Sequence, residues 1–280
     1  MQTGQPSRTA LGAAAHRAVH QTLEGGVIFA DPFALQILDD GTRAGLAQMA
    51  NDPAHLPMRL FIAARSRFSE DTMAACVKRG VRQIVILGAG LDTFSLRNPH
   101  AGKGARVFEV DYPATQAWKR ERLKQAGLRL PASLVFAPVD FERQGLSEGL
   151  AAAGFRADQP AYFQWLGVTM YLTREAIIAT LDFIAGIAGS EVVFEYSEPL
   201  ENLPPAMRAN LTTVAERAAS FGEPWLSLFD SAEMAALLSA RGFGQFWDVT
   251  RTELAARYYG DLGQGLATSP GAHMVRAASR

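Results

Sequence analysis

Glycine, acidic and aromatic residues stand at the ends of three short aliphatic runs, and together they could hold a nucleoside. They are Gly88, Ala89, Gly90 and Asp92 after the first run, Glu109 and Asp111 after the second, and Asp140 and Phe141 after the third. Glycine lets a backbone approach a ligand closely, and a carboxylate can accept hydrogen bonds from two ribose hydroxyls. Such runs predict strands whose ends meet at one edge of a sheet.

The glycine loop at residues 88–93 could belong to three classes of nucleotide loop. A phosphate-binding Walker loop is excluded, because no lysine follows the glycines. A dinucleotide loop is disfavoured, because Thr93 replaces its third small residue and Asp92 would face a pyrophosphate. The third class binds a nucleoside without phosphates, as in S-adenosylmethionine, whose ammonium and sulfonium groups are cationic and tolerate an acid. The loop favours this class.

The later strand ends are consistent with that nucleoside. A carboxylate about 20 residues after the loop is placed to accept both ribose hydroxyls, and Glu109 and Asp111 are both candidates. Asp140 and Phe141 are placed for an adenine amino group and an adenine face. Which of the two acids after the second run binds the ribose stays open.

The order of elements predicts an α/β fold. Residues up to 79 show helical spacing, including a helix that begins at Asp31-Pro32. Seven strand candidates follow, at residues 83–88, 106–111, 134–140, 161–168, 191–197, 244–250 and 272–277. Helical stretches separate the first five, which indicates a doubly wound, mostly parallel, Rossmann-like sheet.

The chain is predicted to form one domain over residues 1–280. Residues 1–79 form an N-terminal helical cap, residues 80–280 form the core, and residues 197–230 form a helical insertion that could act as a lid. Ser231 is the expected N-cap of a helix that stops near Gly242. The last two strands are expected to pair antiparallel, with only a loop between them.

Composition excludes several classes of protein. Of the 280 residues, 48% are hydrophobic and 20% are charged, which is typical of a globular protein, and the net charge of −1 gives no field for nucleic acid or anionic membrane. No apolar run approaches the roughly 20 residues of a membrane span, and we predict no secretory signal. The single cysteine, Cys76, favours a cytoplasmic location.

The chain resembles the leucine carboxyl methyltransferase family, and most closely its bacterial branch associated with secondary metabolism. The similarity lies in "ARSRFSED" (64–71), "RQIVILGAGLDTFSLR" (82–97), "VFEVDYPATQAWKRERL" (107–123) and "GVTMYLTREAI" (167–177). It covers most of the chain up to about residue 185. The resemblance implies a Rossmann-like fold and S-adenosylmethionine as cofactor, with S-adenosylhomocysteine as product.

The resemblance also implies roles for individual residues. Arg65 would bind the methionyl carboxylate, and Arg17 would close over that carboxylate or the acceptor. Gly88 would line the methionine and ribose, Asp111 would bind the ribose hydroxyls, and Asp140 with Phe141 would define the adenine end. One departure is Leu166, which stands where the family usually has a glutamate beside the cofactor. The absence of this glutamate would weaken cofactor binding, move the acceptor or abolish activity.

The acceptor is expected to be a small molecule, with a carboxylate favoured. A carboxylate is ionised at neutral pH and needs no general base, whereas a phenol or alcohol needs one. His16, Tyr171, Glu195 and Tyr196 are the candidate acceptor-side residues. His16 and His20 lack the glutamate of a zinc motif, so no metal site is predicted.

Three further functions remain as alternatives. They are hydroxyl O-methylation, a non-catalytic protein that binds S-adenosylmethionine and, more distantly, a nicotinamide oxidoreductase. The sequence leaves the oligomeric state open.

Overall fold

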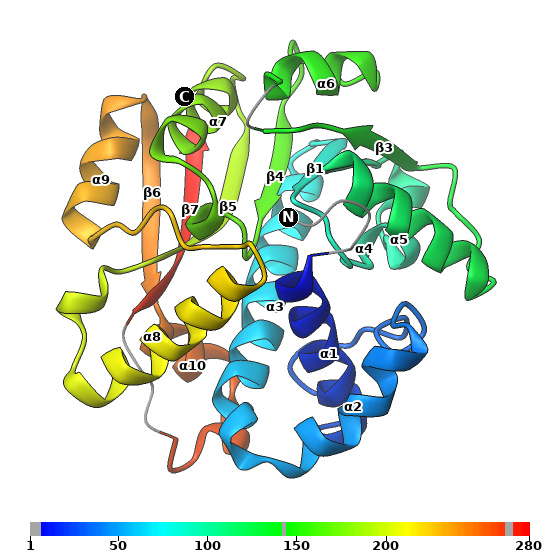
Figure 1. Ribbon diagram of the computed structural model, residues 1–280. Helices are drawn as coiled ribbons and strands as arrows, with labels where there is room; N and C mark the ends of the chain where they lie inside the picture. The colour runs from blue at the N-terminus through cyan, green and yellow to red at the C-terminus, as the bar shows by residue number, and fades with distance from the viewer. Residues whose placement is uncertain (1–6, 142–143, 267–270) are drawn as a thin grey trace.

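The computed structural model describes residues 7–141, 144–266 and 271–280, so the first six residues of the predicted cap lie outside the described part. Its sheet has seven strands in the order β3-β2-β1-β4-β5-β7-β6 (Figure 1). They are β1 Gln83–Leu87, β2 Arg106–Asp111, β3 Leu134–Pro138, β4 Ala161–Trp165, β5 Glu191–Ser197, β6 Phe243–Thr250 and β7 Ala272–Ser279. The predicted Rossmann-like fold is confirmed.

The strand directions place the ends of β1 to β5 at one edge. These five strands are parallel, and β7 runs antiparallel to both β5 and β6. Every residue of β1, β4 and β5 is buried, because helices cover both faces of a parallel sheet. The order reverses between β1 and β4, which is where α/β sheets bind ligands.

Helices cover both faces of the sheet. They are α1 Arg8–Leu23, α2 Asp40–Asn51, α3 Leu56–Lys78, α4 Phe94–Arg97, α5 Pro113–Gln125, α6 Leu146–Ala152, α7 Arg174–Ala185, α8 Pro205–Ser220, α9 Ser231–Ala240 and α10 Arg251–Tyr258. Helices α6, α7 and α9 share one apolar cluster with the sheet, and α3, α4 and α10 share another on the opposite face. A third cluster joins α1 to α5 and to residues 34–38. No described helix is long and apolar enough to cross a membrane.

The helix expected at Asp31-Pro32 is absent, and residues 32–37 form turns instead. The side chain of Asp31 forms one local and two distant hydrogen bonds. It accepts hydrogen bonds from Thr93 Oγ1 at 2.7 Å, from the Phe33 amide at 3.1 Å and from Arg17 Nε at 3.3 Å. The buried carboxylate therefore ties the N-terminal segment to the loop after β1, and this tertiary contact overrides the local helix signal.

Two details of the C-terminal third also differ from the expectation. The connection between β6 and β7 contains α10, which begins with a capping box of Thr250 and Glu253. The S/T-x-x-E spacing was present in the sequence and was missed. The N-cap of α9 is Asp230, whose side chain accepts from the Glu233 amide, and Ser231 is the first residue of the helix.

The insertion at residues 197–230 lies against α1. It contains a short 3-10 turn at Leu200–Asn202, helix α8 and an extended segment up to residue 230. The carboxylate of Glu223 accepts hydrogen bonds from the Arg8 and Thr9 amides and from the Ser7 and Thr9 hydroxyls. The two amides are N–H groups of the first turn of α1 that have no partner within the helix, so the carboxylate joins the insertion to the cap.

We expect Asp31→Ala to lower the free energy of unfolding by about 3–5 kcal/mol, because it leaves the buried Arg17 guanidinium without its anionic partner. Urea denaturation followed by circular dichroism measures the change. Asp40→Ala is the matched control, since its carboxylate is 98% exposed and its one ion pair among the described residues is with Arg43, at 3.4 Å. Equal stability of the two variants would contradict a structural role for Asp31.

Candidate functional site

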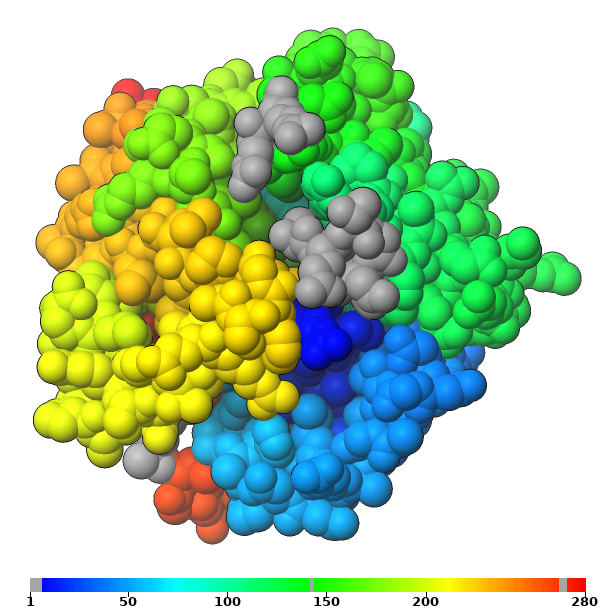
Figure 2. Space-filling model, in the orientation of Figure 1, coloured from blue at the N-terminus to red at the C-terminus, as the bar shows by residue number. Residues whose placement is uncertain are grey.

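A cavity of about 740 Å³ lies at the carboxyl ends of the parallel strands, bounded by α1, α3 and the insertion. Figure 2 shows α1, in dark blue, at the bottom of a recess between α8 in yellow and α2 in blue. The predicted site residues that line the cavity are His16, Arg17, Arg65, Gly88, Ala89, Gly90, Asp92, Asp111, Asp140, Phe141, Leu166, Tyr171 and Glu195. Glu109 and Tyr196 do not reach it.

The glycine loop after β1 is held in a conformation that requires glycine. Gly88 and Gly90 have φ angles of +63° and +43°, in the left-handed region that other residues rarely adopt. A Cβ atom on Gly88 would lie 2.4 Å from Cγ2 of Val168, so a side chain there has no room. The loop therefore presents bare backbone to the cavity.

Asp111 ends β2 and faces this loop. Its carboxylate accepts hydrogen bonds from the backbone amides of Gly90 and Tyr112. Burial raises the pKa of Asp111 to about 6, although the two amide hydrogen bonds favour the charged form. The residue is thus ionised at neutral pH, and it retains lone pairs that a hydroxyl could use.

Glu109 is a structural residue instead of a cavity residue. Its fully buried carboxylate bonds to Lys119 Nζ and to Ser95 Oγ, each at 2.6 Å. Burial raises the pKa of Glu109, and the ion pair with Lys119 opposes that shift. Because α4 and α5 cover this position of β2, the structure leaves Asp111 as the acid of the pair that reaches the cavity.

Glu195 and Arg65 form an ion pair inside the cavity. Arg65 donates through one terminal nitrogen to both carboxylate oxygens of Glu195, at 2.7 and 2.8 Å. Both side chains are largely buried, and Arg65 Nε has no hydrogen-bond partner among the described residues. A buried guanidinium donor without a partner is suited to an anionic ligand.

Tyr196 faces away from the cavity, contrary to expectation. Its hydroxyl donates to Asp248 Oδ2 at 2.6 Å, and its ring stacks on His273 with centroids 4.8 Å apart. Successive residues of a strand point to opposite faces of a sheet, so Glu195 and Tyr196 could not both enter the cavity. The alternation of side chains along a strand was therefore enough to predict that only one of these two residues faces the cavity.

Gln164 is a cavity residue that the sequence pattern did not single out. Its amide nitrogen donates to Asp92 Oδ2 at 3.0 Å, and its oxygen accepts from Ser69 Oγ at 2.8 Å. Asp92 also accepts from the Phe94 amide at the start of α4. A buried polar residue in an otherwise apolar strand, two positions before Leu166, was the available signal. Leu166 itself lines the cavity and packs against the cluster around α3.

Arg17 holds the loop after β1 from the side of α1. Besides its pair with Asp31, it donates to the carbonyl oxygen of Leu91 at 2.5 Å. Its guanidinium thus lies at the cavity wall with two donors already used. This contact explains how the N-terminal helices position the glycine loop.

His16 and Tyr171, the expected acceptor-side residues, line the cavity where the cap meets the insertion. Burial and the neighbouring His55, Arg59 and Arg65 side chains lower the pKa of His16 to about 4. Burial raises the pKa of Tyr171 above its ordinary value. Neither group has the near-neutral pKa that suits a general base. Among the described residues, no group of three or more His, Cys, Asp or Glu side chains is placed to hold a metal ion.

The sheet order, the reversed β7 and the acid facing a glycine loop define a nucleoside-binding protein of the methyltransferase class. The leucine carboxyl methyltransferase family model matches residues 10–185, and the chain belongs to this family. It is therefore an S-adenosylmethionine-dependent methyltransferase.

Curated relatives extend over nearly the whole chain. A Bacillus subtilis protein named "Putative S-adenosyl-L-methionine-dependent methyltransferase YktD" is 28% identical over all of both chains. A Mycobacterium avium relative, named "Putative S-adenosyl-L-methionine-dependent methyltransferase", is 31% identical, over 93% of this chain and 90% of its own.

Solved structures share the fold. A DUF574 family protein from Streptomyces avermitilis superposes with a TM-score of 0.60 at 13% identity, covering 96% of this chain and 97% of that one. A "putative methyltransferase" from Thermobifida fusca gives a TM-score of 0.58 at 16% identity, covering 100% and 97%. At these identities, the likeness supports the architecture alone.

We expect binding of S-adenosylhomocysteine to be constant above about pH 7 and to weaken as the pH falls through 6, because a protonated Asp111 loses acceptor capacity. A pKa of about 6 predicts a loss of about tenfold by pH 5. Calorimetric titration across this range measures it. Asp111→Asn should bind weakly with a flat profile, whereas the exposed Asp158→Asn should match the parent protein. An unchanged profile in Asp111→Asn would exclude this assignment.

Proposed function

We propose that the protein methylates a carboxylate oxygen of a small molecule, with S-adenosylmethionine as the methyl donor. The observation that carries the carboxylate preference is the setting of His16, which lines the cavity and is buried near Arg59 and Arg65. Its pKa of about 4 makes it a poor proton acceptor for a phenol or alcohol. A carboxylate needs no proton removed, because its own pKa is about 4.

The cavity residues fit this cofactor. Asp111 would accept the ribose hydroxyls, and the unpartnered Nε of Arg65 would donate to the methionyl carboxylate. The carboxylate of Asp92 lies in the glycine loop, where it would attract the cationic ammonium group of the cofactor. Asp140 and Phe141 line the far end, where an adenine would lie. Gly88 and Gly90 would let the backbone approach the methionine and ribose.

The chemistry supplied by S-adenosylmethionine is one methyl cation equivalent: a C–O bond forms to the acceptor as the C–S bond breaks, and the electron pair remains on sulfur. The chain's own residues bind and orient the reactants and exclude water, which is what an in-line transfer requires. Glu195 fixes the guanidinium of Arg65, and Tyr171 lies where it could orient an acceptor oxygen. Glu195 and Tyr171 are thus proposed as positioning residues.

We also propose that residues 197–230 cover the acceptor side as a lid on a single methyltransferase domain. The hydrogen bonds from residues 7–9 to Glu223 support this, since they close the insertion onto the cap. The assignment to secondary metabolism and to the cytoplasm stays a prediction.

Methyl-tritiated S-adenosylmethionine tests the reaction, because the label follows the methyl group to any acceptor. The protein is incubated with the low-mass fraction of bacterial extracts and with a panel of carboxylic acids and matched phenols. We expect labelled products that release volatile methanol in mild alkali, because methyl esters hydrolyse there and methyl ethers do not. We also expect kcat/KM to be flat between about pH 7 and 9.

Each other outcome identifies a different function. Alkali-stable label, with kcat/KM rising with pH, would indicate a hydroxyl acceptor and a general base. No label from a protein that binds S-adenosylhomocysteine would favour the non-catalytic alternative. Asp111→Asn serves as the background control.

We expect Leu166→Glu to tighten binding of S-adenosylmethionine by about two- to fivefold, with less effect on S-adenosylhomocysteine, because only the former carries a sulfonium charge. Leu166→Gln is the matched control, since it is similar in size and uncharged. Calorimetry on the three proteins with both ligands measures the difference. Equal effects of the two substitutions on both ligands would show that the family glutamate position makes no charge contact in this chain.

A further inference from the structure

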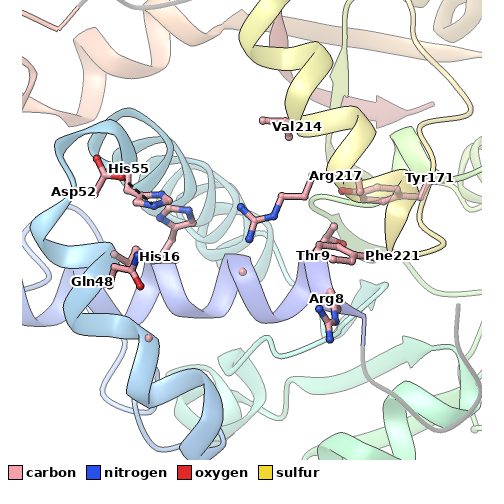
Figure 3. A pocket seen from close by; sticks show the side chains of 14 residues that line it. Arg8, Thr9, His16, Gln48, Asp52, His55, Tyr171, Val214, Arg217 and Phe221 are labelled. Carbon is pink, nitrogen blue, oxygen red and sulfur yellow. Dashed lines mark ion pairs between the residues drawn. The ribbon is translucent and has the colours of Figure 1, made fainter.

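A second cavity, of about 430 Å³, adjoins the first between α1, α2 and α8 (Figure 3). We call it the α8 cavity. It shares Thr9, Gly12, His16, Tyr171 and Val214 with the central cavity, and none of residues 88–92 lines it. A ligand could therefore extend from the central cavity past His16 and Tyr171 into a space that is remote from the glycine loop.

Two arginines give this cavity its charge. The guanidinium carbons of Arg8 and Arg217 lie 4.9 and 5.9 Å from the centroid of the same Phe221 ring. Among the described residues, neither guanidinium forms an ion pair. Figure 3 shows Arg217 reaching from α8 toward His16 of α1. Two like charges near one ring repel each other, and an anion bound in the cavity would relieve that repulsion.

The other polar side chains of the cavity are those of Thr9, Gln48, Tyr171, two histidines and one acid. Among the described residues Asp52 is the single carboxylate in the lining, and its Oδ2 lies 3.9 Å from Nε2 of His55. The ring of His16 lies 5.4 Å from that of His55. His16 is 8% exposed, and its Nδ1 has no hydrogen-bond partner among the described residues. A buried polar atom without a partner is costly, and a ligand could satisfy it.

The remaining lining residues are apolar or glycine, with Met49, Val214 and Phe221 as the largest of these side chains. An aliphatic chain suits these walls, and an anionic end suits the two arginines. Resting on the proposed function, we propose that the methyl acceptor is a dicarboxylic acid that spans both cavities. One carboxylate is methylated in the central cavity, and the other is held in the α8 cavity by Arg217 and Arg8.

The test uses the full-length protein saturated with S-adenosylhomocysteine. Calorimetry compares succinate, glutarate, adipate, suberate and sebacate with the monocarboxylates of equal chain length. We expect one or more of the dicarboxylates to bind at least about tenfold more tightly than the matching monocarboxylate, because a second charge-assisted contact is made. Added salt should reduce this preference, since Arg8 and Arg217 are exposed to solvent.

Arg217→Gln should remove that preference, with a loss of about ten- to a hundredfold for the dicarboxylate and no change for the monocarboxylate. In turnover, the same substitution should raise KM for the dicarboxylate and leave kcat unchanged, which loss of folding would not do. Arg129→Gln is the matched control, because it removes the same charge from an exposed position in the loop between α5 and β3, outside both cavities.

The outcomes separate this inference from the proposed function. If S-adenosylhomocysteine binds but dicarboxylates show no preference, or Arg129→Gln loses as much as Arg217→Gln, the α8 cavity does not hold an anionic group. If S-adenosylhomocysteine itself does not bind, the cofactor site and this inference fail together. For either conclusion, Arg217→Gln must bind S-adenosylhomocysteine as tightly as the parent protein does.

Discussion

The turn after β1 is the constraint on which the site depends. Gly88 and Gly90 adopt positive φ angles there, and the neighbouring Val168 leaves no space for a Cβ at Gly88. Three elements form hydrogen bonds to this loop. Asp111 of β2 accepts from the Gly90 amide, and Gln164 of β4 donates to Asp92. Arg17 of α1 donates to the Leu91 carbonyl. The ends of two strands and the cap helix are thereby positioned relative to one backbone segment.

The same contacts explain how the cap contributes to the site although it precedes the sheet in the chain. Asp31 is buried with Arg17 and Thr93, so one carboxylate joins α1 to the loop. Glu223 joins the start of α1 to the insertion. The helix is thus held at its start and at Arg17 by acids from two other segments, and His16, which lines both cavities, lies between these contacts. The cap helix thus positions His16, whereas strand β5 positions Glu195.

The sheet was predictable because each strand is a short aliphatic or aromatic run with a clear boundary, and a parallel sheet buries such runs on both faces. Asp111, Gly88 and Gly90 were predictable because ligands of α/β sheets bind at strand ends. Tyr196 was misjudged and Gln164 was not singled out, although strand alternation decides the side on which each lies. Asp31 could not have been interpreted correctly, because its partners Arg17 and Thr93 are distant in sequence and its local pattern is that of a helix start. Glu223 had no local signal at all.

The charge around Arg65 also bears on the departure at Leu166. Arg65 is paired with Glu195 of β5, and a Cβ on Gly167 would lie 3.2 Å from both of its terminal nitrogens. The end of β4 therefore lies close to this guanidinium, and a glutamate at position 166 would bring a second carboxylate near it. With Leu166, the buried guanidinium of Arg65 is paired with one acid, Glu195, and its Nε has no hydrogen-bond partner among the described residues. Leucine in place of the family glutamate at position 166 thus removes a negative charge from the methyl-donor side of the cavity. The guanidinium of Arg65 remains there as a cationic group for an acidic ligand.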